Sequence, residues 1–124
     1  TAVRLIVTDL DGTLLGPDGQ ISEADADALL EASRRGVHLV VATGRPARWL
    51  GCLKPIAAAH PHVIVSNGAA VMDLTSGALT QVQAIPGDVV ASVVARLRAA
   101  RPDVLFGSEH GDGFHCEPTW PLRE

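Results

Sequence analysis

The sequence predicts an α/β fold in which a parallel sheet carries helices on both faces. Three observations support this prediction. Strand-like and helix-like segments alternate from residue 3 to residue 65, the strand-like segments are almost continuously apolar, and each ends in a short polar or glycine-containing turn. Apolar strands of this kind are typical of a parallel sheet that is buried by helices on its two faces.

The first strand is expected over residues 3–7, an apolar run that only Arg4 interrupts, and we expect it to be buried. The segment Thr8-Asp9-Leu10-Asp11-Gly12-Thr13-Leu14-Leu15 follows it. Because side chains alternate along a strand, Asp9 and Asp11 are expected to point the same way at its tip. Two like charges this close are costly unless a cation lies between them or one is protonated. The pair therefore predicts a site for a divalent metal, and its structural alternative is a turn cap.

Two further strands and two helices complete the first half of the chain. Ser22 is a helix cap with acidic residues after it, and Pro46 suits the first position of a helix. The third strand is closed by Ser66-Asn67-Gly68. The expected elements are a helix over residues 22–36, a strand over residues 37–42, a helix over residues 46–59 and a strand over residues 63–65.

The pattern changes in the second half, and we place a domain boundary there, between residues 1–83 and 84–124. Before the boundary, residues 70–74 and 78–83 flank Thr75-Ser76-Gly77, which indicates a hairpin. After it come a helix over residues 87–100, with apolar side chains at helical spacing, a strand over residues 104–106, and a polar stretch over residues 107–124.

The composition excludes several classes of protein. The 124 residues suffice for one modest domain or part of a larger one, and 47% of them are hydrophobic, which predicts a packed core. The net charge of −4 argues against a nucleic-acid partner, and no apolar stretch approaches the length of a membrane span. Two cysteines, Cys52 and Cys116, predict no disulfide framework, and with no signal-peptide pattern we expect a cytoplasmic protein.

Polar residues occupy the tips of the three expected strands, where open α/β sheets bind their ligands. Backbone N–H groups and a hydroxyl at a helix start suit a phosphate oxygen, and a carboxylate pair with a metal suits attack at phosphorus. For Thr43 the alternative is an ordinary helix cap, for Asn67 an Asn-Gly turn, and Arg45 is interpreted as a surface residue at a helix start. The residues at the strand tips are Asp9, Asp11, Thr43, Gly44, Ser66 and Asn67.

Three segments carry a resemblance to a known family. Asp9-Leu10-Asp11-Gly12-Thr13-Leu14 resembles the first motif of the haloacid dehalogenase-like (HAD) phosphohydrolases, and Thr43-Gly44-Arg45-Pro46 resembles the second. Ser66-Asn67-Gly68-Ala69 is similar to the segment after the third strand in the Cof-type branch. That branch inserts an α/β cap after this strand, so the resemblance implies a Rossmann-like core over residues 1–83 and the beginning of a cap over residues 84–124.

The resemblance also implies the chemistry. Asp9 would attack the phosphoryl group of a small phosphorylated metabolite, such as a sugar phosphate, and become an aspartyl phosphate. Asp11 would protonate the leaving oxygen and then activate water. Mg²⁺ would bind the carboxylate of Asp9 and the backbone carbonyl of Asp11. Thr43, together with Gly44 and Asn67, would bind the phosphoryl oxygens.

The sequence departs from the family because two of the family's motifs are missing. In the family the third motif is a lysine, and the fourth is a Gly-Asp segment followed by a second aspartate. Lys54 lies in the helix after the second motif, and Gly111-Asp112-Gly113 lacks the second aspartate. We therefore expect the N-terminal portion of a longer hydrolase, with the first strand as an open edge that favours self-association. A missing cation at ~4 Å and an effective dielectric of ~20 is worth roughly 4 kcal/mol, so we expect these residues alone to bind Mg²⁺ weakly and turn over slowly or not at all.

Other functions remain open at this point. A phosphomutase of the same superfamily is the alternative among enzymes, and a non-catalytic interaction module is the alternative outside them. The polar stretch is interpreted as a loop that selects substrates rather than a second metal site, because its ligand spacing fits no zinc pattern. Its possible ligands are Glu109, His110, Asp112, His115, Cys116 and Glu117.

Overall fold

The computed structural model describes residues 2–111 and 113–121. The chain forms two compact units, Thr1–Gln83 and Ala84–Glu124. Unit 1 contains the strands and helices that alternate in the first part of the sequence, and unit 2 contains the long helix and the polar stretch. The division falls where the sequence pattern changes.

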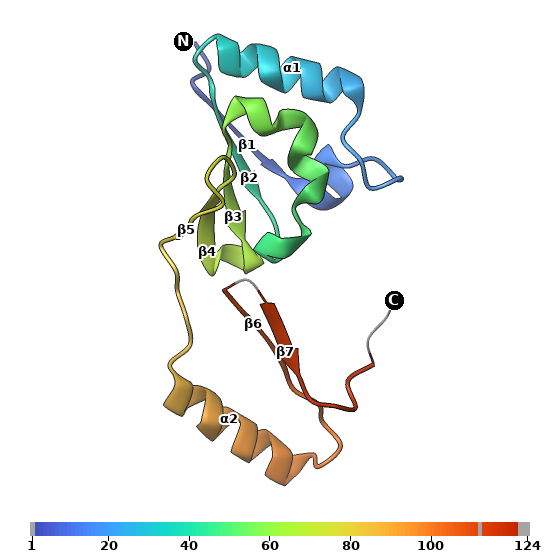
Figure 1. Ribbon diagram of the computed structural model, residues 1–124, viewed down its shortest axis with the longest axis vertical. Helices are drawn as coiled ribbons and strands as arrows, with labels where there is room; N and C mark the ends of the chain where they lie inside the picture. Colours follow the sequence, from blue (N-terminus) through green and yellow to red (C-terminus); the bar gives the residue numbers. More distant parts are fainter. Residues whose placement is uncertain (1, 112, 122–124) are drawn as a thin grey trace. The chain divides into compact units, whose positions relative to one another are not determined.

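Unit 1 is built on a five-stranded sheet with the order β1-β2-β3-β4-β5 (Figure 1). The first three strands are parallel, whereas β4 and β5 form the antiparallel hairpin predicted around residues 75–77. The α/β fold with a parallel core is therefore confirmed. The strands are β1 (Leu5–Asp9), β2 (His38–Ala42), β3 (His62–Val65), β4 (Ala70–Asp73) and β5 (Leu79–Thr80).

The strand register brings the C-terminal ends of the parallel strands level with one another. Asp9 pairs with Ala42, and Ala42 pairs with Ile64. The backbone N–H of Thr43, the residue after β2, donates to the carbonyl of Ile64 at 2.9 Å. Asp9 and Thr43 therefore lie at neighbouring strand ends, on the edge of the sheet where such folds bind ligands.

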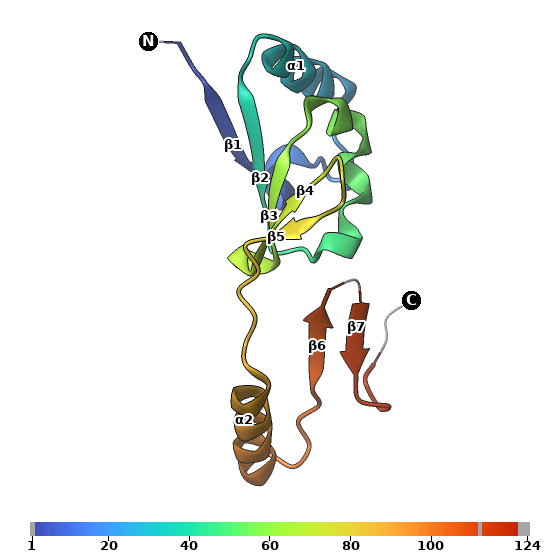
Figure 2. The same ribbon diagram turned by 60° about the vertical axis from the view of Figure 1, so that its left-hand side comes forward.

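Within the described residues, the helical elements beside this sheet lie on one of its faces, so the expectation of helices on both faces is not met (Figures 1 and 2). Helix α1 (Glu23–Arg34) begins after Ser22, whose hydroxyl accepts the N–H of Asp25 at 3.1 Å, so the predicted cap is confirmed. The α-helix predicted over residues 46–59 is wrong, because the chain forms two 3₁₀ segments there, η2 (Ala47–Trp49) and η3 (Gly51–Ala59). Pro55 lies inside η3 and has no N–H to donate, which disfavours a regular α-helix.

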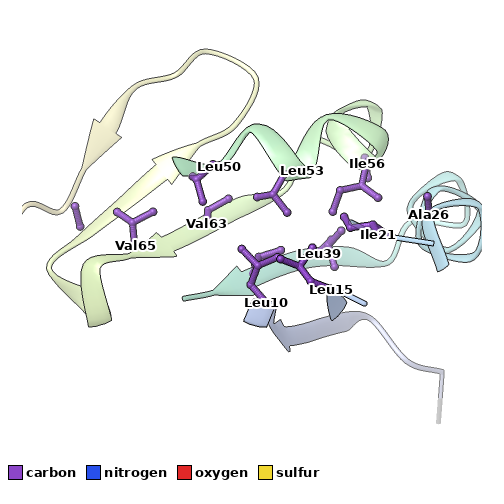
Figure 3. Packing of buried hydrophobic residues seen from close by; sticks show 13 residues of the cluster. Leu10, Leu15, Ile21, Ala26, Leu39, Leu50, Leu53, Ile56, Val63 and Val65 are labelled. Carbon is purple, nitrogen blue, oxygen red and sulfur yellow. The ribbon is translucent and has the colours of Figure 1, made fainter. Parts of the chain in front are cut away.

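The hydrophobic core of unit 1 lies between the sheet and these helical elements (Figure 3). Val41 and Val63 from the sheet and Leu53 and Ile56 from η3 are all completely buried. Burial of each such side chain stabilises the fold by about 1.5–3 kcal/mol. The core therefore fixes β2 and β3, whose C-terminal ends carry the predicted site.

The opposite face of the sheet is open at β1. Leu5 and Val7 are 53% and 57% exposed, so the prediction of a buried first strand is wrong. Alternate residues of β1 face opposite sides of the sheet, and the neighbouring Ile6 packs against the core. Among the described residues, β1 is one of the two edge strands of the sheet, and α1 and η3 cover only the other face.

Unit 2 contains helix α2 (Gly87–Ala100), as predicted, and a hairpin of β6 (Gly107–His110) and β7 (Gly113–Cys116). The strand predicted over residues 104–106 is wrong, since pairing begins at Gly107. The ring of Phe114 occupies the space that a Cβ at Gly107 would need, at 2.5 Å, so a glycine at that position lets the ring lie against the strand. No helix in the described part of the chain, α2 included, has the length and apolar character needed to cross a membrane.

Candidate active site

A cavity of about 350 Å³ lies at the C-terminal ends of the parallel strands. Four of the five predicted site residues, Asp9, Thr43, Gly44 and Asn67, line it, and the fifth, Asp11, does not. The structure therefore brings together residues that are up to 58 positions apart, from the ends of three strands. The lining residues are Asp9, Ala42, Thr43, Gly44, Ile64, Asn67 and Gly68.

A larger cavity, of about 410 Å³, lies between α1, η3 and the N-terminal ends of β2 and β3. Its polar lining side chains are Ser33, His38, His60 and His62. It contains no carboxylate and none of the strand-tip residues. This cavity is the larger of the two, but only the smaller one has a carboxylate and a threonine hydroxyl in its lining, so we take the smaller one as the candidate active site.

Asp9 reaches the cavity because the chain turns directly after β1. Leu10 is completely buried and its carbonyl accepts the N–H of Leu15 at 2.9 Å, which closes the turn. Gly12 has a φ of 76°, a left-handed conformation that glycine adopts without strain. The hydroxyl of Thr13 lies 3.4 Å from the Oδ2 atom of Asp9. The turn thus holds the Asp9 carboxylate at the end of its strand.

Thr43 is the buried polar residue of the site, with an exposed fraction of 6%. Its Oγ1 atom accepts the backbone N–H of Arg45 at 3.1 Å, and its carbonyl accepts the N–H of Asn67 at 3.2 Å. Because Oγ1 acts as an acceptor toward Arg45, the hydroxyl proton can be donated to a ligand in the cavity. The alternative that Thr43 is an ordinary helix cap is wrong, because η2 has Pro46 at its N-cap and the Thr43 hydroxyl instead accepts an N–H within the turn after β2.

Asn67 approaches Gly44 closely across the cavity. A Cβ atom at Gly44 would lie 3.0 Å from the Oδ1 atom of Asn67, so the position favours a residue without a side chain. The backbone of Asn67 is left-handed, with a φ of 56°, and that of Ser66 is too, with a φ of 50°. Non-glycine residues adopt this conformation rarely, and local strain of this kind is found frequently at functional sites.

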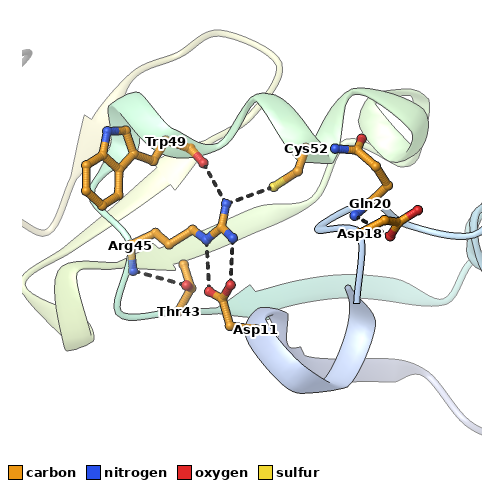
Figure 4. Close-up of polar contacts among 7 residues, drawn as sticks. All are labelled: Asp11, Asp18, Gln20, Thr43, Arg45, Trp49 and Cys52. Carbon is orange, nitrogen blue, oxygen red and sulfur yellow. Dashed lines mark hydrogen bonds and ion pairs between the residues drawn. The ribbon is translucent and has the colours of Figure 1, made fainter. Parts of the chain in front are cut away.

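The carboxylate of Asp11 forms an ion pair with Arg45 (Figure 4). Nε and Nη2 of Arg45 donate to the two Asp11 oxygens at 2.8 and 2.6 Å. The hydrogen bond from Arg45 lowers the pKa of Asp11 below its ordinary value, and the same bond raises the pKa of Arg45. The interpretation of Arg45 as a plain surface residue is wrong. The sequence places Arg45 two residues after Thr43, at the tip of the second strand, and this position already indicated that Arg45 lies near the site.

The oxygen donors of the site suit Mg²⁺, which binds proteins through one or two carboxylates and completes its shell with water and phosphate. The Asp9 carboxylate lines the cavity, whereas the side chain of Asp11 is engaged by Arg45. Within the described residues, no group of three or more His, Cys, Asp or Glu side chains is arranged to hold a metal. The Asp9 carboxylate therefore fits part of a magnesium site, and the Asp11 carbonyl is the second donor that the family resemblance implies.

The first part of the polar stretch of unit 2 forms the paired strands β6 and β7 rather than an irregular loop. The rings of His110 and His115 lie 3.9 Å apart on it, but within residues 107–111 and 113–117 no third side chain joins them in a metal-binding group. Asp112, another of the possible ligands, lies outside the described residues.

The chain belongs to the haloacid dehalogenase-like hydrolases, whose family profile matches residues 6–117. The resemblance carried by the motifs at Asp9, Thr43 and Ser66 is thus confirmed. The HMP-PP phosphatase of Shigella flexneri is 33% identical over 108 residues, covering 87% of this chain and 39% of the relative. The 5-amino-6-(5-phospho-D-ribitylamino)uracil phosphatase YcsE of Bacillus subtilis is 34% identical over 71 residues, covering 57% of this chain and 28% of the relative.

Solved structures show the same relationship. BT1666 from Bacteroides thetaiotaomicron, described with phosphatases of this superfamily, has a TM-score of 0.79 and 28% identity, covering 96% of this chain and 43% of that one. A haloacid dehalogenase-like hydrolase from B. subtilis has a TM-score of 0.73 and 29% identity, with 90% and 38% coverage. The chain thus spans about two fifths or less of these relatives.

Proposed function

We propose that this chain carries the nucleophile and the phosphate-binding half of the active site of a Mg²⁺-dependent phosphohydrolase. The observation that supports this most is the common cavity of Asp9, Thr43, Gly44 and Asn67 at the strand ends of a chain from this family. Both relatives named above are phosphatases of small phosphorylated molecules. The substrate class we propose is accordingly a small phosphorylated metabolite.

Hydrolysis is proposed to run in two steps. A carboxylate oxygen of Asp9 attacks phosphorus, the bond from phosphorus to the leaving oxygen breaks, and a proton passes from Asp11 to that oxygen. Water then attacks the aspartyl phosphate and gives a proton to Asp11, and the bond between Asp9 and phosphorus breaks. The cycle restores both side chains and releases an alcohol and phosphate.

The remaining residues bind the charge of the phosphoryl group. The hydroxyl of Thr43 donates to a phosphoryl oxygen, and Gly44 allows the backbone and Asn67 to approach that group closely. Such donors act most strongly where water is excluded, and removal of one costs about 10²–10³-fold in rate in comparable sites. Mg²⁺, when bound at Asp9 and the Asp11 carbonyl, offsets the negative charge of the phosphate.

We also propose that unit 2 is the beginning of a cap domain that contributes to substrate selection. Its boundary, between residues 83 and 84, lies beyond the third strand, after which the Cof-type branch inserts its cap. The third motif of the family, a lysine, and its fourth motif, a Gly-Asp segment with a second aspartate, have no match among these residues. We therefore propose that full activity requires residues outside this sequence. The cytoplasmic location stays a prediction.

The proposal is tested by screening the full-length protein for phosphate release from a panel of phosphorylated metabolites with and without Mg²⁺. Asp9→Asn is expected to abolish turnover, while Asp27→Asn, which changes an exposed carboxylate of α1, leaves it unchanged. Equal loss in both variants, or full activity of Asp9→Asn, would refute the proposal. With a hexose phosphate, an isomerised product without phosphate release would identify a phosphomutase instead.

A further inference from the structure

Asn67 and Gly68 form an Asn-Gly pair on the wall of the active-site cavity. Both residues line the cavity and both are exposed. In such a pair the backbone nitrogen of the glycine lies only four bonds from the side-chain carbonyl carbon of the asparagine, so the two atoms can close a five-membered ring. Asn67 is the only asparagine in the sequence, so this chemistry has one candidate site.

The backbone around the pair leaves room for this ring closure. Gly68 has a φ of 95°, and a Cβ atom built there would meet no atom of the described residues within 4 Å, so its nitrogen is not shielded by a side chain. Ser66 and Asn67 are left-handed, with φ values of 50° and 56°, a conformation that is strained for residues with a side chain. The strain lowers the cost of leaving the present conformation.

Two hydrogen bonds hold the same turn and slow the reaction. The N–H of Asn67 donates to the carbonyl of Thr43, and the N–H of Ala69 donates to the carbonyl of Ser66, both at 3.2 Å. Ring closure requires the peptide plane after Asn67 to turn away from its ψ of 33°, so the turn must open locally first. A ligand that binds only the closed cavity therefore suppresses the reaction.

We propose that Asn67 is a site of spontaneous deamidation and that this modification inactivates the phosphate-binding cavity. The backbone nitrogen of Gly68 gives up its proton and bonds to the Cγ atom of Asn67. The bond from Cγ to Nδ2 breaks, and ammonia leaves with that proton. Water then opens the ring at either of its two carbonyl carbons, which gives an aspartate or an isoaspartate at this position.

The effect on the cavity rests on the proposed function, in which Asn67 helps to bind the phosphoryl group. Deamidation replaces the amide NH₂, which donates hydrogen bonds, by a carboxylate oxygen that only accepts them. The new negative charge lies in a cavity that already contains the carboxylate of Asp9 and is proposed to bind an anion. Loss of one donor costs about 10²–10³-fold in rate in comparable sites, so we expect modified molecules to be inactive.

The experiment incubates the full-length protein at alkaline pH, where the backbone nitrogen loses its proton more readily, and follows one tryptic peptide by mass spectrometry. Trypsin is expected to release residues 49–96 intact, because Lys54 is followed by Pro55, and Asn67 is the only asparagine in that peptide. A mass increase from the exchange of NH₂ for OH therefore reports on one position. A second sample contains inorganic phosphate and Mg²⁺, and a synthetic peptide of residues 62–71 is the unfolded reference.

We expect conversion to be fastest in the synthetic peptide, slower in the protein, and about tenfold slower again with phosphate and Mg²⁺. Phosphatase activity declines in proportion to the unmodified peptide. Asn67→Asp, which has the product carboxylate on a normal backbone, is expected to be about 10²-fold less active than the wild type. Asn67→Gly begins at a lower activity because it lacks the amide, but keeps that activity throughout the incubation.

Three results would overturn the inference. They are an unchanged mass in the protein while the synthetic peptide is converted, full activity in converted protein, and a decay of Asn67→Gly as fast as that of the wild type. Equal conversion with and without phosphate and Mg²⁺ would overturn the link to the cavity. A wild type without turnover would instead refute the proposed function, and the mass of the peptide would still decide whether Asn67 is modified.

Discussion

The Oδ1 atom of Asn67 lies 3.0 Å from the place where a Cβ atom of Gly44 would be. The two residues follow different strands, β2 and β3, and their approach forms one wall of the cavity. The backbone N–H of Asn67 donates to the carbonyl of Thr43 at 3.2 Å and keeps this wall in place. The contact across the site thus favours a glycine in the second motif.

We expect Gly44→Ala to displace the side chain of Asn67 and to lower kcat/KM about tenfold, equivalent to 1.4 kcal/mol. The cause is the contact with Asn67, so the double variant Gly44→Ala/Asn67→Gly is expected to lose no more than Asn67→Gly alone. Steady-state kinetics of the four proteins in this cycle measure the coupling. Additive losses would show that the two positions act independently.

Thr43→Val is expected to lower kcat/KM about 10²-fold, because it removes the hydroxyl that donates to the phosphoryl group. It also leaves the N–H of Arg45 without its acceptor, which costs about 1–3 kcal/mol where the group is buried. Thr43→Ser keeps the hydroxyl and is the control for both effects. Kinetics and thermal unfolding measured on the same samples distinguish them, and a Ser variant as impaired as the Val variant would contradict the hydroxyl's role.

The stability of unit 2 is expected to depend on pH through Glu117. Its carboxylate pairs with Arg98 and accepts the N–H of Phe106 at 3.2 Å, and the Arg98 hydrogen bond is the main cause of its lowered pKa. A carboxyl with a lowered folded pKa stabilises the fold above its unfolded pKa of 4.5, and this contribution disappears as the pH falls through the folded value. Glu117→Gln should therefore destabilise unit 2 at pH 7.

The measurement is unfolding followed by the fluorescence of Trp120, in a Trp49→Phe background that removes the other tryptophan. Trp120 packs edge-on against Phe114, with ring centroids 5.5 Å apart, so it reports on unit 2. The difference between Glu117→Gln and its parent should be constant at neutral pH and shrink below pH 4.5. If the difference in stability between the two proteins instead grows as the pH falls, the carboxylate of Glu117 does not stabilise unit 2 in the way we expect.

The exposed edge of β1 predicts self-association of the 124-residue chain. Leu5 and Val7 present apolar side chains beside unpaired strand groups, a combination that favours pairing with another chain. We expect Val7→Lys to reduce the concentration-dependent increase in mass seen by sedimentation velocity. Val89→Lys, at a 44% exposed valine of α2, is the control. Equal effects of both variants would show that the contact between chains is not specific to β1.

Local sequence patterns predicted the elements that depend on neighbours in the chain. Ser22 caps α1 because its hydroxyl reaches an N–H three residues away, and the hairpin at residues 75–77 depends on its own turn. Elements that depend on packing were placed less well. Pro55 lies in a 3₁₀ segment where Pro46 at a first helical position predicted an α-helix, and the first strand of unit 2 begins at Gly107 rather than at residue 104.

The sequence by itself determined the α/β class, the residues at the strand tips and the family, because these are properties of spacing and of motifs that are continuous along the chain. Only the tertiary structure decided that Asp9 lines the cavity while Asp11 faces Arg45, 34 residues away. The direction of a side chain depends on strand register and on partners from other elements. The second motif places Arg45 at the tip of a strand, but no pattern within either motif shows that its side chain pairs with Asp11, which is why the ion pair was not predicted.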